Sequence, residues 1–117
     1  MLVGVIASSE LGLVNVNING HLIEGVSSLE PGVQVCACIR PEEVTLALVE
    51  ASNSARNTFS GTITGITSTG PLVRVTVDCD FPLIALITTR SAEDLELHKG
   101  MNVCASFKAT GVNIVEG

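Results

Sequence analysis

One short segment of the chain, Ser54-Ala55-Arg56-Asn57, combines groups that can hold an oxyanion. It offers a hydroxyl, a guanidinium and an amide, and backbone N–H groups in a turn can form a concave nest of donors. Arg56 adds a positive charge and a planar fork that contacts two oxygens at once. Many loops contain serine and arginine, so the segment by itself is either a binding site or a plain linker.

The elements that must position this segment are predicted to be strands. Valine, isoleucine and threonine account for 34 of the 117 residues, and β-branched side chains favour the pleated surface of a sheet. Residues 13–18 and 73–77 alternate apolar and polar side chains with the period of a half-buried strand. Several short strands separated by turn residues indicate an all-β barrel or sandwich. The turns are expected at Asn19-Gly20, Glu30-Pro31-Gly32, Thr69-Gly70-Pro71 and Lys99-Gly100.

A single segment, Ser91 to Leu97, is predicted to be helical. Ser91 is a good N-cap residue, and the acidic residues that follow it favour the positive end of the helix dipole. Gly100 is expected to stop the helix, which would be only about one or two turns long.

The chain also repeats itself. Residues 35–40, Val-Cys-Ala-Cys-Ile-Arg, align with residues 103–108, Val-Cys-Ala-Ser-Phe-Lys, and residues 4–6 match residues 61–63. The offset between the copies grows from 57 to 68, so the second copy has about eleven extra residues, roughly the predicted helix. We interpret this as two related β units in tandem; the alternative is two unrelated strands that share a Val-Cys-Ala tripeptide.

Composition excludes several classes of function. Twelve acidic and six basic residues give a net charge of −6, and the aromatic residues are three phenylalanines, which argues against binding duplex or single-stranded nucleic acid. No apolar run approaches the roughly twenty residues of a membrane-spanning helix, and no basic region precedes the first apolar stretch, so neither a membrane span nor a signal peptide is expected.

The cysteine and histidine residues form no recognisable site. The spacing of the four cysteines matches no standard zinc pattern, so we expect reduced thiols that pack in the core and no bound metal. His21 and His98 lie next to turns and are expected to be solvated. No Ser/His/Asp or Cys/His pairing stands out, so no catalytic residue is assigned and this chain alone is not expected to be an enzyme.

From Ser54 to its end the sequence resembles the molybdate/tungstate-binding barrel family of the Mop or TOBE type, over about 55% of the chain. Four motifs carry the resemblance, in the order expected for the family. They are Ser54-Ala55-Arg56-Asn57 followed by Phe59, Gly61 and Ile63; the alternating strand that ends at Val77-Asp78; Thr88-Thr89-Arg90-Ser91-Ala92 with Leu95, Leu97 and Gly100; and Phe107-Lys108-Ala109-Thr110 before Val112.

The first half resembles the segment that follows the nucleotide-binding domain in ATP-driven (ABC) importers, most typically in Ile39-Arg40-Pro41-Glu42-Glu43-Val44. The two resemblances together imply the C-terminal regulatory domain of a molybdate or tungstate importer's ATPase subunit. The sequence holds no Gly-x-x-x-x-Gly-Lys-Ser/Thr run, so the phosphate-cradling loop of an ATPase is missing from it.

The family resemblance also implies a set of ligand contacts. By match to the motifs, the anion would be held by Ser54, Arg56, Thr88, Ser91 and Lys108, assisted by backbone N–H groups such as those of Ala55 and Ala109. A tetrahedral dianion accepts hydrogen bonds only, and none of these residues is acidic. Family sites often lie between two chains, so a homodimer is implied. Arg40 is the repeat partner of Lys108, but the first half lacks a Ser-Ala-Arg-Asn loop, and a structural or interface role is preferred for it over a second anion site.

These interpretations define the expectations for the structure. The fold is predicted to be all-β, with tandem OB-like (Mop/TOBE) barrels and one short helix. Residues 1–50 would form the first OB-like unit and residues 51–117 the Mop-like oxyanion-binding barrel, a division that leaves open an exchange of strands between the two.

The expected function is molybdate or tungstate binding, with no cofactor, in a domain that inhibits an ABC importer by feedback. The implied partners are the ATPase domain and the membrane permease, at the cytoplasmic face of the membrane, and no nucleic acid. The alternatives are a freestanding storage protein of the molbindin kind, a purely structural transporter tail, and an OB-type module for another ligand.

Overall fold

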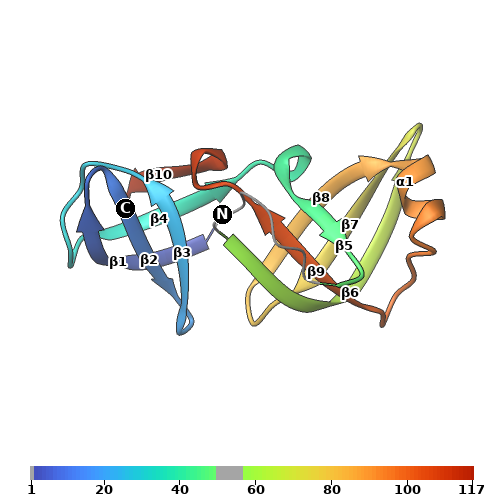
Figure 1. Ribbon diagram of the computed structural model, residues 1–117, viewed down its shortest axis with the longest axis horizontal. Coiled ribbons are helices and arrows are strands. Elements are labelled where there is room, and N and C mark those ends of the chain that lie inside the picture. Colours follow the sequence, from blue (N-terminus) through green and yellow to red (C-terminus); the bar gives the residue numbers. More distant parts are fainter. Residues whose placement is uncertain (1, 50–56) are drawn as a thin grey trace.

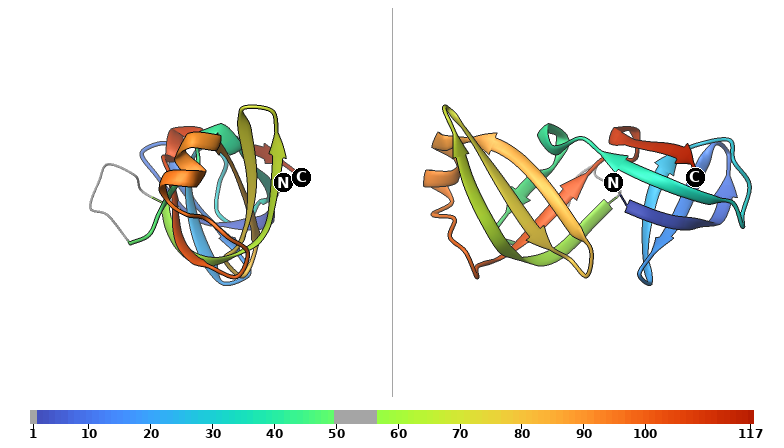
Figure 2. Two further views of the ribbon diagram at one scale, coloured as in Figure 1. Left: turned by 90° about the vertical axis from the view of Figure 1, so that its right-hand side faces the viewer. Right: turned by 180° about the vertical axis from the view of Figure 1, so that it is seen from behind.

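The structure is a computed structural model that describes residues 2–49 and 57–117. Its two β units lie end to end along the long axis of a molecule of 42 × 28 × 23 Å (Figure 1). Seen from the α1 end, one unit lies behind the other (Figure 2, left). The strands are β1 (Leu2–Glu10), β2 (Leu13–Ile18), β3 (His21–Val26), β4 (Gln34–Ile39), β5 (Thr45–Ala47), β6 (Asn57–Thr69), β7 (Leu72–Asp78), β8 (Pro82–Thr88), β9 (Asn102–Phe107) and β10 (Val112–Glu116); the helices are η1 (Pro41–Glu43), α1 (Thr89–Asp94) and η2 (Ala109–Gly111).

The first unit is a closed barrel with the strand order β1-β2-β3-β10-β4, called here the first barrel. The predicted alternation along β2 is confirmed, because Val14, Val16 and Ile18 are all buried while the residues between them face outward. The second unit is a five-stranded sheet with the order β5-β9-β6-β7-β8, called here the second sheet. It curls around its own core in Figure 1, and this all-β architecture with a short helix is the predicted fold class.

Two strands cross between the units. β5 follows β4 and η1 in the chain but pairs with β9 in the second sheet, while β10 follows β9 and η2 but pairs with β4 in the first barrel. The view from behind shows β10 lying beside β4 on the first barrel (Figure 2, right). Residue 50 lies outside the described residues, so the division of the chain at that point stays a prediction.

The internal repeat is confirmed by the registers of the strands. Gly4 pairs with Val35 in the first barrel, and Gly61 pairs with Val103 at the corresponding place in the second sheet. An added Cβ would lie 2.4 Å from a backbone oxygen at Gly4 and 2.6 Å from one at Gly61, so the same close approach requires glycine in both copies. A break in register follows Ile6 in one copy and Ile63 in the other.

The helix differs from its prediction at both ends. α1 begins at Thr89 rather than Ser91 and ends at Asp94, well before Gly100. Thr88 is the N-cap: its backbone is extended, and its hydroxyl oxygen accepts a hydrogen bond from the Ser91 N–H at 3.1 Å. Ser91 thus lies inside the first turn, and its backbone N–H is the group that Thr88 caps. None of the helices that the structure describes has the length and apolar composition that a membrane crossing requires.

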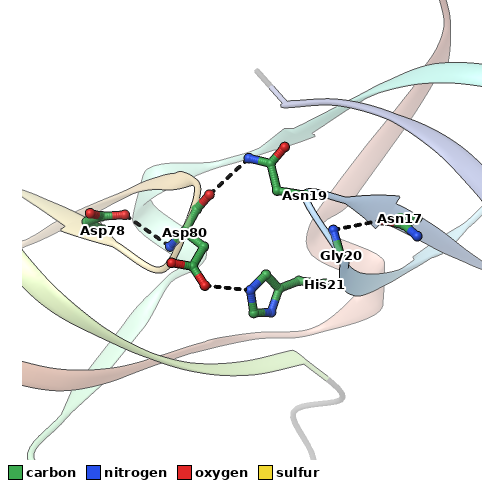
Figure 3. Close-up of polar contacts among 6 residues, drawn as sticks. All are labelled: Asn17, Asn19, Gly20, His21, Asp78 and Asp80. Carbon is green, nitrogen blue, oxygen red and sulfur yellow. Dashed lines mark hydrogen bonds and ion pairs between the residues drawn. The ribbon is translucent and has the colours of Figure 1, made fainter.

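A set of long-range contacts fixes the first barrel against the second sheet. His21 Nε2 lies 2.9 Å from the Asp80 carboxylate, and the Asn19 side-chain amide donates to the Asp80 carbonyl oxygen at 2.9 Å (Figure 3). The His21 ring also meets the rings of Phe59 and Phe81 edge to face, at centroid distances of 6.2 and 5.8 Å. The expectation that His21 is simply solvated is therefore wrong, because this histidine joins the two units.

Candidate functional site

The hydroxyls of Thr88 and Ser91 form one compact donor–acceptor pair. Thr88 Oγ1 donates to Ser91 Oγ at 2.9 Å while it accepts from the Ser91 backbone N–H. Both side chains are exposed. Because Thr88 donates its proton to Ser91, the hydroxyl proton of Ser91 remains available for donation to a ligand.

These two hydroxyls line a cavity of about 460 Å³ between α1, β8, β5 and η1. Most of the other residues that line it are aliphatic, but the acidic residues Glu42 and Asp94 also line it. Like charges disfavour a dianion next to a carboxylate. The hydroxyl pair therefore needs cationic donors from elsewhere before it can hold an oxyanion.

Lys108 and Ala109 lie where β9 passes into η2. Lys108 is exposed and extended, and Ala109 behind it is buried, with 6% of its surface exposed. The Lys108 carbonyl oxygen accepts from the Gly111 N–H at 2.9 Å, which fixes the short turn. The Lys108 side chain makes no capping hydrogen bond to η2.

The two groups lie at opposite ends of the second sheet. Phe107, next to Lys108, pairs with Asn57 at the start of β6, whereas Thr88 pairs with Leu72, which pairs with Thr69 at the end of β6. In Figure 1, α1 lies at the outer end of the sheet, and β9 runs from that side toward the first barrel.

The structure therefore brings Thr88 and Ser91 together but does not bring them to Lys108 and Ala109. Among the described residues, neither Lys108 nor Ala109 lines the cavity that Thr88 and Ser91 share. Ser54, Ala55 and Arg56 lie outside the described residues, so their part in a site stays a prediction.

Asn57 has a role that the sequence analysis did not assign. Its side chain is 2% exposed and makes two hydrogen bonds to the backbone of one residue in β3: Oδ1 accepts from the Glu24 N–H at 2.7 Å, and Nδ2 donates to the Glu24 carbonyl oxygen at 2.9 Å. The side-chain amide thus bonds to the backbone of β3 as a neighbouring strand would, and it connects the second sheet to the first barrel. The sequence signal that could have indicated this role is the position of Asn57 at the end of the Ser-Ala-Arg-Asn motif.

The cysteines are all free thiols, Cys79 buried and the other three half-buried. Burial, the nearby Asp78 and Asp80 carboxylates and Cys104 together raise the pKa of the Cys79 thiol to about 11. Within residues 2–49 and 57–117, no group of three or more His, Cys, Asp or Glu side chains is arranged to hold a metal ion.

The fold is that of a small tandem β-barrel domain. The sequence pattern of the TOBE domain matches residues 53–114, more than half of the chain. The chain belongs to the TOBE domain family.

Two curated relatives match parts of the chain. The molybdate/tungstate import ATP-binding protein WtpC of Pyrococcus horikoshii is 36% identical over 77 residues, which is 65% of this chain and 22% of WtpC. The molybdenum transport protein ModE of Azotobacter vinelandii is 43% identical over 61 residues, which is 50% of this chain and 23% of ModE. The chain thus spans less than a quarter of the length of either relative.

A solved structure matches almost the whole fold. The cytoplasmic molybdate-binding protein ModG, with molybdate bound, superposes with a TM-score of 0.90 over 99% of this chain and 94% of its own. The two sequences are 21% identical, so the likeness establishes the tandem architecture and no more.

Proposed function

We propose that the chain binds molybdate or tungstate and serves as the regulatory domain of an ABC importer ATPase. The observation that carries the proposal is the paired hydroxyls of Thr88 and Ser91, which stand at family-motif positions in a TOBE domain. The match to WtpC, whose name gives molybdate and tungstate as the imported anions, supports the choice of ligand. Because the match covers 22% of WtpC, it is consistent with a module of a larger protein.

The geometry favours a site shared by two copies of the chain. Thr88 and Ser91 lie at one end of the second sheet and Lys108 at the other, so one small anion can contact all three only if two chains contribute. Lys108 of one chain would then bring a positive charge to the cavity, where Glu42 and Asp94 are the charged residues among the described ones that line it.

The expected affinity follows from the number of donors. Hydrogen bonds to a charged group contribute about 1.5–3 kcal/mol each, and several of them, less the cost of ordering and desolvation, are enough for micromolar binding. The site would be completed by Ser54, Arg56 and the N–H groups of Ala55 and Ala109.

Regulation would work through the dimer. An anion bound between two chains stabilises the arrangement that brings both half-sites together, and that arrangement would hold the attached ATPase domains apart. Linkage requires the anion to bind more tightly in this inhibited state. The partners would be the ATPase domain and the permease, at the cytoplasmic face of the membrane. In the assembled transporter, added oxyanion should then lower ATP hydrolysis; an unchanged rate would refute the regulatory part.

Isothermal titration calorimetry with molybdate, tungstate and sulfate tests the binding itself. We expect saturable heat with the first two anions, and a loss of affinity of at least about ten-fold in Lys108→Ala and in Thr88→Val. Arg74→Ala is the control, because Arg74 is an exposed base on β7 outside the proposed contacts. Unchanged affinity in both test variants would refute the assigned residues and favour a purely structural tail.

A freestanding oxyanion-storage protein is the second candidate. The near-complete mutual coverage with ModG favours it, because a protein of about this size carries the whole fold on its own. Reading the parent gene for a nucleotide-binding domain upstream of residue 1 separates the two proposals.

A further inference from the structure

Two thiols of the first barrel lie outside its core, on the outer face of one strand. Along β4, Val35 and Ala37 are fully buried, whereas Cys36 and Cys38 are half-buried. Neither cysteine belongs to the buried core cluster or to the partly buried apolar side chains packed against it. The expectation that the cysteines pack in the core is therefore wrong for this pair, and the pair is open to a ligand.

We propose that Cys36 and Cys38 together bind one Cu(I) ion as two thiolate ligands. The site would take a soft cation, whereas the proposed function concerns a hard oxyanion. It lies in the first copy of the repeat, while Thr88, Ser91 and Lys108 belong to the second. It does not depend on the proposed function.

The strand geometry brings the two sulfurs within reach of one ion. Side chains two residues apart on a strand point to the same face, with their Cα atoms about 6–7 Å apart. Two sulfurs that share one ion lie about 4–5 Å apart, twice the length of a metal–thiolate bond, and the two side chains can span that separation. A disulfide would require the sulfurs to approach to about 2 Å, so the extended strand favours a shared ion over a bond between Cys36 and Cys38.

The surroundings of the pair suit a soft ion. Cys36 lies between Val3 and Val115 on the neighbouring strands, and Cys38 lies opposite Asn113 on β10. The two valines are 58% and 48% exposed, so this face is apolar and still reached by solvent. Hard cations such as Mg²⁺ and Ca²⁺ prefer carboxylate and carbonyl oxygens, whereas thiolates select soft ions. None of these three paired side chains is a carboxylate, so the pair favours a soft ion.

The number of ligands selects among the soft ions. Structural zinc sites are almost always four-coordinate, and iron–sulfur clusters are held by four ligands. Within the described part of the chain, no third His, Cys, Asp or Glu joins the two thiols in a metal-holding group. Two thiolates alone fit Cu(I), a soft monovalent ion. On binding, two S–H bonds break, two S–Cu bonds form and two protons leave to solvent, with no oxidation or reduction.

The second copy of the repeat provides the contrast. Cys104 stands at the position of Cys36, but Ser106 stands where the first copy has Cys38. The Cys104 thiol shares a hydrogen bond with the Ser60 hydroxyl at 3.7 Å. The second copy thus has one outward thiol where the first has two, and Cys104→Ser is the matched control for substitutions of the pair.

Anaerobic titration of the reduced chain with Cu(I), in competition with the chromophoric chelator bathocuproine disulfonate, tests the site. Native mass spectrometry counts the copper per chain, and circular dichroism checks the fold of each variant. We expect one copper per chain in the wild type and affinity within about two-fold of it in Cys104→Ser. Cys36→Ser and Cys38→Ser should each bind at least about 100-fold more weakly, because loss of a residue that only orients a ligand already costs about 10–100-fold.

Alkylation by iodoacetamide, read by peptide mass spectrometry, is a second measurement. Bound copper should protect Cys36 and Cys38, while Cys104 should react at the same rate with and without copper. Failure of the wild type to retain copper against the chelator would overturn the proposal. Equal weakening in Cys104→Ser, or copper found only in a dimer of chains, would also overturn it, because the ion would then not be held by the pair within one chain.

Discussion

Substituting Asn57 tests how the two units are held together. Asn57→Ala removes both hydrogen bonds to the Glu24 backbone, at 2.7 and 2.9 Å, from a side chain that is 2% exposed. The Glu24 N–H and carbonyl groups would be left without these partners in a part-buried place. Leaving a buried polar group unsatisfied costs about 1–3 kcal/mol, so with two groups and some access of water we expect the free energy of unfolding to fall by about 2–4 kcal/mol.

Urea unfolding followed by far-ultraviolet circular dichroism is the appropriate assay, because the chain has no tryptophan or tyrosine for fluorescence. For a chain of this size the expected loss corresponds to a melting temperature lower by about 8–16 °C. Asn15→Ala is the matched control: its amide makes one exposed hydrogen bond, to Ser8 Oγ, and its loss should cost less than about 1 kcal/mol. If Asn57→Ala were no less stable than Asn15→Ala, the inferred clamp between the units would be wrong.

Four further predictions concern stability and reactivity. Gly61→Ala should lower the free energy of unfolding by about 1–3 kcal/mol, because the new Cβ would lie 2.6 Å from a backbone oxygen. Gly65→Ala on the same strand is the control and should cost less, because its Cβ would meet nothing nearer than 3.9 Å. Equal urea midpoints for the two variants would contradict this. The pKa of the Cys79 thiol is raised from 9.0 to about 11 in the folded chain, so this thiol ionises at lower pH in the unfolded chain. The neutral thiol therefore contributes its full stabilisation below pH 9 and loses it between pH 9 and 11. Cys79→Ala should remove that part of the pH dependence of the free energy of unfolding. Cys79 should also be the last thiol alkylated at pH 8, as read by peptide mass spectrometry, and early labelling would refute its burial. Asp80→Asn should lower stability by less than about 1 kcal/mol, because His21 and Asp80 are 38% and 79% exposed; a larger shift of the urea midpoint would show that the pair matters more than its exposure implies.

The local part of the fold was predictable from the sequence. Period-two alternation indicated β2 and β7, and Gly20, Gly32, Gly70 and Gly100 at the expected turns all have positive φ. These signals depend on neighbouring residues alone. The turn at Leu11-Gly12 was not predicted. Leu11 has a φ of 54°, a left-handed conformation that leucine rarely adopts, so its presence does not indicate a turn.

The features that the sequence did not reveal depend on distant residues. His21 meets Asp80, which is 59 residues away, so the Asn-Gly turn beside it was no guide to its surroundings. Asn57 was quoted within its motif, but its partner is the backbone of Glu24, and backbone groups leave no trace in residue identity. The start of α1 was wrong because Thr88 and Ser91 are both acceptable N-caps, and the choice between them depends on where β8 ends.

The crossing of β5 and β10 means that neither unit is self-sufficient. A fragment cut at the boundaries of the family match, residues 53–114, would carry most of β10 without the barrel that it closes, and it would leave the outer edge of β9 bare. An unpaired edge is a template for pairing with another molecule. The architecture resembles a strand-exchanged dimer of two half-length chains, in which each repeat unit supplies its last strand to the other, joined here in one polypeptide. A single half is therefore expected to fold only by exchanging strands with a second copy.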